Sequence, residues 1–100
     1  MNLSESLRKS VSGVLPSDEI DTGVAIIEYS IKDFEQKKHP KDYMGLTRDE
    51  IRRRLHLEDI HINRKDLQEV LDTLYQNSFI VCRKKLHYSA ASRFKQQYKR

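Results

Sequence analysis

The sequence predicts one α+β domain in which three helices precede a terminal β-hairpin, and three observations predict it. Apolar residues recur at a helical period in three segments between residues 17 and 77. Near Phe79 the pattern changes to a run of β-forming residues, followed by alternation of apolar and polar residues. The length of 100 residues, with 37% hydrophobic and 34% charged residues, allows one small core.

Residues 1–16 contain Ser, Gly and Pro without a sustained period, and they are predicted to be a flexible leader. They contain too few apolar residues for a secretory signal, and no apolar run in the chain is long enough to span a membrane. Cys82 is the single cysteine and cannot form an internal disulfide. These features favour an intracellular location, nuclear in a eukaryote and otherwise cytoplasmic.

The first predicted helix spans residues 18–38 and ends before Pro40, because proline cannot continue a helix. Ser17 is expected to cap it, and acidic residues occupy its first turn, where the helix dipole favours them. An amphipathic stripe of this kind is buried against other elements. The stripe comprises Ile20, Val24, Ile27, Ile31 and Phe34.

Two further helices follow. Thr47 and Glu50 match a capping box, which predicts a short helix over residues 48–55. Asn63 is placed to cap a third helix over residues 64–77. The inward positions of the short helix are Leu46, Ile51 and Leu55, and the apolar face of the third comprises Leu67, Val70, Leu71, Leu74 and Tyr75.

Two strands are predicted at residues 79–83 and 86–89, joined by Lys84 and Lys85 as a two-residue turn. A hairpin this small is not stable alone, so it is expected to close one end of the helical core. The predicted core comprises Ile20, Val24, Ile27, Ile31, Phe34, Leu46, Ile51, Leu55, Leu67, Val70, Leu71, Leu74, Phe79 and Val81.

This order of elements is that of a winged helix, in which the second and third helices form a helix-turn-helix and the hairpin is the wing. The domain is expected to span residues 17–90. Residues 91–100 form a basic tail, in which Phe94 and Tyr98 would share one face if the tail extends as a helix. A frayed terminus is the alternative for the tail.

Three stretches carry a resemblance to a known group: "LTRDEI", "IHINRKDLQEVLDTL" and "NSFIVCRKKLHYS". Together they resemble the winged-helix modules of the general transcription machinery, and most nearly the core domain of the beta subunit of general transcription factor IIE. In that family a similar long helix precedes an LT-x-x-EI segment, and a short hairpin closes the unit. The resemblance implies binding of duplex DNA or of partner proteins within a transcription complex.

Basic residues concentrate in the second part of the chain. Residues 1–44 contain 6 Lys and Arg against 8 Asp and Glu, whereas residues 45–100 contain 13 against 7. A basic surface attracts polyanions, and the second helix of a helix-turn-helix crosses the DNA backbone. The alternative is a solvated helix face with local salt bridges to Asp49 or Glu50. The candidate nucleic-acid-binding residues are Arg52, Arg53, Arg54, Lys65, Arg83, Lys84, Lys85, Arg93 and Lys95.

The outward face of the third helix points to a different function. It carries two acids, Glu69 and Asp72, and carboxylates are unfavourable in a groove lined by phosphates unless they accept hydrogen bonds from cytosine. Reading of bases in the major groove is therefore not expected. What remains is DNA binding through the backbone or the wing or, as the alternative, docking of a protein partner on this face. The candidate partner-binding residues of that alternative are Gln68, Glu69, Asp72 and Gln76.

No constellation of catalytic or metal-binding residues is found. His39, His56, His61 and His87 lack compact ligand spacing and are expected on the surface or in loops. Cys82 lies in an apolar strand and is expected to be a packed thiol rather than a nucleophile. We therefore expect no enzyme activity, no metal and no cofactor. The predicted function is binding of double-stranded DNA with low sequence specificity in a transcription or replication assembly, with protein interaction as the alternative.

Overall fold

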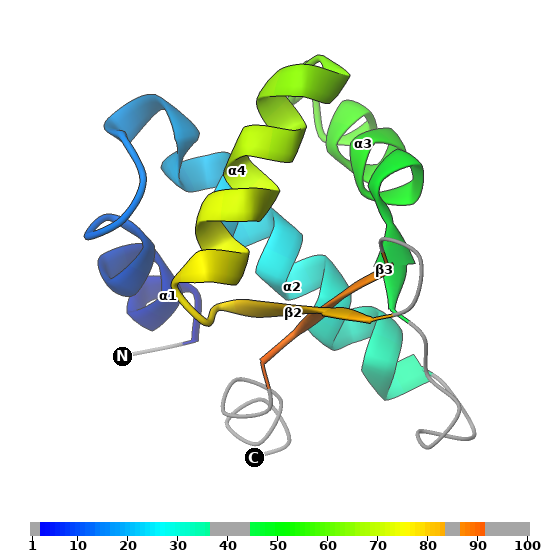
Figure 1. Ribbon diagram of the computed structural model, residues 1–100, viewed down its shortest axis with the longest axis horizontal. Helices are drawn as coiled ribbons and strands as arrows, with labels where there is room; N and C mark the ends of the chain where they lie inside the picture. Colours follow the sequence, from blue (N-terminus) through cyan, green and yellow to red (C-terminus); the bar gives the residue numbers. More distant parts are fainter. Residues whose placement is uncertain (1–2, 37–44, 84–86, 92–100) are drawn as a thin grey trace.

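The computed structural model describes residues 3–36, 45–83 and 87–91, and within these it has four α-helices and a three-stranded antiparallel sheet (Figure 1). Its α+β class agrees with the sequence prediction. The element order is compatible with a winged helix without being specific to it. The elements in chain order are α1 (Leu3–Val11), the 3-10 turn η1 (Ser17–Glu19), α2 (Ile20–Gln36), β1 (Leu46–Thr47), α3 (Arg48–Leu57), α4 (Arg64–Gln76), β2 (Ile80–Arg83) and β3 (His87–Ala90).

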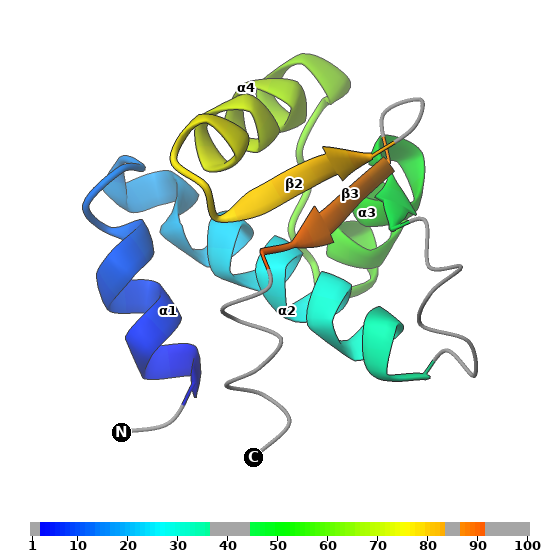
Figure 2. The same cartoon turned by 60° about the horizontal axis from the view of Figure 1, so that its bottom comes forward.

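The sheet has the order β1-β3-β2, so the last strand is the central one. The hairpin lies between α4 and α2, with β2 against α4 and β3 against α2 (Figure 2). The strand β1 was not predicted, because two residues are too few to show an alternating pattern. It exists because Leu46 and Thr47 pair with Tyr88 and His87 of β3.

Gly45 allows the chain to enter β1 beside β3. Its φ of 94° lies in the left-handed region that favours glycine. A Cβ at this position would come within 2.5 Å of Tyr88 O. The pairing that carries the chain into α3 therefore requires a residue without a side chain.

The predicted core is largely confirmed. Eleven of its positions are buried: Val24, Ile27, Ile31, Leu46, Ile51, Leu55, Leu67, Val70, Leu71, Leu74 and Phe79. Ile20 and Phe34 are only partly buried. The prediction is wrong for Val81, which is 37% exposed, whereas Ile80 is 1% exposed. Ser78 has a φ of 63°, and the strand begins after it at Ile80, so alternation turns Ile80 inward and Val81 outward.

The prediction of a flexible leader is wrong for the described part of residues 1–16. Leu3–Val11 forms α1, which packs against α2, and Leu7, Val11 and Leu15 belong to the core. Gly23 of α2 leaves room for this segment, since a Cβ there would come within 2.6 Å of Leu15 Cδ1 and 3.1 Å of Val11 Cγ1. The helix has only 9 residues, so its apolar positions are too few to give a sustained period.

The ends of the elements differ from the prediction by a few residues, as expected for helix termini. Ser17 does not cap a helix, because it begins the 3-10 turn that leads into α2. The short helix continues to Leu57 rather than ending at residue 55. The predicted end of the first helix at residue 38, the Lys84-Lys85 turn and the basic tail from residue 92 lie outside the described residues.

Candidate nucleic-acid interface

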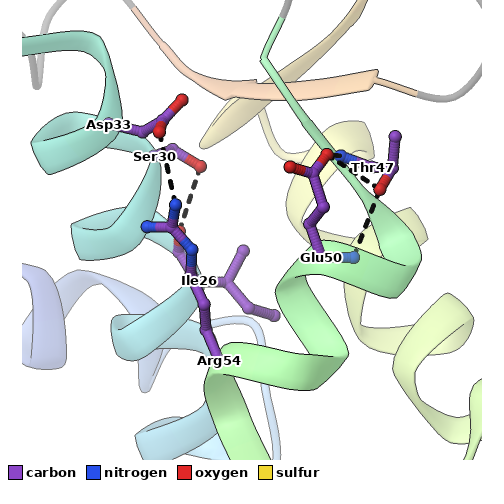
Figure 3. A network of polar contacts seen from close by, with 6 residues as sticks. All are labelled: Ile26, Ser30, Asp33, Thr47, Glu50 and Arg54. Carbon is purple, nitrogen blue, oxygen red and sulfur yellow. Dashed lines mark hydrogen bonds and ion pairs between the residues drawn. The ribbon is translucent and has the colours of Figure 1, made fainter. Parts of the chain in front are cut away.

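A capping box fixes the start of α3, as predicted (Figure 3). Thr47 Oγ1 accepts a hydrogen bond from Glu50 N at 3.2 Å, and Thr47 N donates to Glu50 Oε1 at 3.0 Å. The hydrogen bond from the Thr47 backbone is the main cause that lowers the pKa of Glu50 below its ordinary value of 4.5. The carboxylate therefore stays charged at neutral pH and holds the first turn of the helix.

A second polar network joins α3, α4 and β3. Arg48 Nη1 donates to Gln68 Oε1 at 3.0 Å, and Gln68 Nε2 donates to Asp72 Oδ1 at 2.9 Å and to Tyr88 Oη at 3.1 Å. Gln68 was predicted to bind a partner, but its amide is already engaged within the chain. The network fixes α3 relative to α4, and Arg48, which the sequence analysis did not select, is part of it.

The three consecutive arginines have three different environments. Arg54 extends toward α2, where its Nη2 lies 3.3 Å from Asp33 Oδ1 (Figure 3). The Asp33 side chain is 9% exposed and the Arg54 side chain 37%. Arg54 is therefore engaged by a buried carboxylate, in contrast to the phosphate contact predicted for it.

Arg52 and Arg53 lie on the outer side of α3. Arg52 Nε donates to Ile62 O at 2.8 Å, which ties the helix to the segment before α4 and leaves its Nη groups for other contacts. Arg53 is exposed, and no described residue forms a hydrogen bond or ion pair with it. These two side chains are the members of the predicted site that the structure keeps together on one surface.

A groove of about 450 Å³ runs along this surface. One helical stripe of α3 forms one wall, and Arg64, the first residue of α4, contributes from the other side. Arg64 Nε lies 3.7 Å from Asp49 Oδ1. The groove thus has three guanidinium groups and one carboxylate, and we call it the α3 groove. Its lining residues are Asp49, Arg52, Arg53, His56, Leu57 and Arg64.

The outer face of α4 is acidic, as the sequence indicated. Lys65, Glu69, Asp72 and Gln76 are all exposed there. The turn η1 brings Asp18 and Glu19 near this surface. Desolvation, and then the charges of Asp18, Glu69 and Asp66, raise the pKa of Glu19 above its ordinary value of 4.5. The charge of this face is therefore opposite in sign to that of the α3 groove.

Of the remaining predicted cations, the structure describes only the backbone of Arg83. Arg83 ends β2, where its backbone pairs with His87 of β3. Lys84, Lys85, Arg93 and Lys95 lie outside the described residues. The basic contribution of the hairpin tip and of the tail therefore stays a prediction.

The histidines and the cysteine do not form a compact ligand set in the described part of the chain. The rings of His56 and His61 lie 5.1 Å apart, and His61 Nε2 is 3.2 Å from Asp59 Oδ1. Among the described residues, no group of three or more metal-binding side chains is present. The prediction of a packed thiol is wrong, because Cys82 is exposed on β2, an edge strand of the sheet. His39 is outside the described residues.

No protein family model, curated protein sequence or solved structure matches this chain. Within the described ranges, no helix has both the length and the apolar character that crossing a bilayer requires.

Proposed function

We propose that this chain is a winged-helix binding protein, not an enzyme, that holds duplex nucleic acid with low sequence specificity in an intracellular transcription or replication assembly. The observation that supports it best is the α3 groove, where three arginines face one carboxylate. Guanidinium groups form charge-assisted, bidentate hydrogen bonds with phosphate oxygens. The order of α2, β1, α3, α4, β2 and β3, and the excess of basic residues after residue 45, support the same proposal.

Low specificity follows from the acidic face of α4. A helix that reads bases must enter the major groove between two rows of phosphates. Glu69 and Asp72 oppose that approach, so contacts are confined to the backbone, which carries no sequence information. The proposed surface comprises the α3 groove and the cations of the hairpin, Arg83, Lys84 and Lys85.

A salt series with a labelled duplex tests the proposal by fluorescence anisotropy. If these cations neutralise about four or five phosphates, log K falls with log salt at a slope of about −4, since each phosphate contributes about 0.9. Arg53→Ala should flatten the slope by about one and weaken unrelated sequences equally. Lys9→Ala is the matched control, because Lys9 is an exposed cation on α1, and it should leave the slope unchanged.

Absence of salt-dependent binding at physiological ionic strength would refute this proposal. Docking of a protein partner on α4 is the second candidate, and the acidic surface of α4 and η1 favours it, together with Tyr75, which is 51% exposed. The variant Glu69→Ala separates the two, because it removes a charge from the acidic face and leaves Asp72 in its hydrogen bond with Gln68. It should leave duplex binding equal or slightly stronger, but it should abolish a complex that forms through this face.

A further inference from the structure

The ion pair between Asp49 and Arg64 in the α3 groove is weak. Its atoms are 3.7 Å apart, and the side chains are 64% and 65% exposed. An exposed pair at this distance contributes little to folding, because water screens the charges and both side chains lose rotamer freedom. It can therefore open without disturbing the fold.

The charges around this pair are unequal. Among the described residues, Arg53 has no hydrogen-bond or ion-pair partner, and Arg52 donates a hydrogen bond only through its Nε. Asp49 is the single carboxylate among the lining residues, so it balances at most one of three guanidinium groups. An anion that enters the groove meets two available cations and competes with Asp49 for the third.

We infer that the α3 groove is a phosphate site, and that Asp49 is the resident anion which a phosphate group displaces from Arg64. The inference rests on the proposed function and narrows it to one subsite. A phosphodiester has two non-bridging oxygens that share one negative charge, and one guanidinium group can bind both. The next phosphate along the strand can bind the next arginine. Asp49 lowers the affinity for any single anion, so only a ligand with several phosphates in a row is held well.

The test compares duplex affinity in wild-type protein and in Asp49→Asn, which keeps the side-chain shape and removes the charge. Affinity should rise about two- to fivefold, the range expected when an exposed competing charge pair is removed. Asp18→Asn removes an exposed acid on η1, outside the groove, and should change affinity less. Polyglutamate of similar charge should bind more weakly than the duplex.

A double-mutant cycle shows whether Asp49 acts through Arg64. In an Arg64→Ala background the effect of Asp49→Asn should shrink markedly. An equal effect in both backgrounds would mean that Asp49 acts only as a distant charge, which overturns the inference and leaves duplex binding intact. Tighter binding of polyglutamate than of duplex would also overturn it.

Inorganic phosphate separates this inference from the proposed function. The Arg64 side-chain Nε–Hε signal in NMR spectra should shift with phosphate and saturate at a lower concentration in Asp49→Asn. If the duplex does not bind but this response occurs, the proposed function fails and the phosphate site stands. If neither ligand moves the signal, the inference fails.

Asp49 lies in the first turn of α3, where its charge can also stabilise the helix. If Asp49→Asn lowers the melting temperature, Asp49→Ser serves as the second variant.

Discussion

Replacement of Arg54 by alanine should destabilise the fold, whereas replacement of its neighbour Arg53 should not. Removal of the Arg54 guanidinium leaves the Asp33 carboxylate, 9% exposed, without the group that balances its charge. Breaking a fully buried pair costs about 3–5 kcal/mol. Arg54 itself is 37% exposed, so water reaches the gap, and we expect about 1–3 kcal/mol, the cost of a buried group left unsatisfied.

Urea denaturation measures this difference. Arg53→Ala should change the free energy of unfolding by less than about 0.5 kcal/mol, as is usual for an exposed site. Asp33→Asn combined with Arg54→Ala should cost less than the sum of the single changes, with a coupling of about 0.5–3 kcal/mol. If Arg54→Ala lowers the free energy of unfolding by less than about 0.5 kcal/mol, or if the effects of the two single variants are additive, the ion pair with Asp33 does not stabilise the fold and the reasoning is refuted.

Four further predictions concern stability. Leu7→Ala should lower the free energy of unfolding by about 2–5 kcal/mol in urea, because Leu7 is fully buried, whereas a flexible leader would show no loss. Thr47→Ala should cost about 0.5–2 kcal/mol in the same assay. Because the pKa of Glu50 is lowered, its stabilisation is present above pH 4.5 and lost as pH falls through its folded-state value, so Glu50→Gln should flatten the acid limb of a pH series. Because the pKa of Glu19 is raised, Glu19→Gln should raise the melting temperature at neutral pH, and the gain should vanish in acid.

Local signals in the sequence were sufficient for several elements. The capping box of Thr47 and Glu50 and the cap by Asn63 involve residues three positions apart, and the structure confirms both. The helical stripes of α2 and α4 were long enough to show their period. By contrast, β1 depends on Tyr88, which lies in a strand formed more than forty residues later, and no local pattern reports such a pairing.

The candidate site was predictable only in part, for the same reason. A helical period gives the direction of a side chain but not the group that it meets. Arg54 was predicted to contact phosphate because the sequence does not show that Asp33, 21 residues earlier in the chain, lies next to it in the fold. Arg64 was missed because its place opposite Asp49 depends on how α4 packs against α3, and two opposite charges 15 positions apart predict nothing by themselves.

Arg52 loses rotamer freedom when the chain folds, because its Nε donates a hydrogen bond to Ile62 O in the segment before α4. Immobilising a long side chain during binding costs about 0.5–1.5 kcal/mol. For Arg52 most of this cost falls on folding, before any ligand binds. Arg53 has the same charge and no such restraint in the described structure. If the groove binds phosphate as proposed, Arg52 would be a cation already positioned before binding. Arg53, which is exposed, would lose its rotamer freedom only when the anion binds.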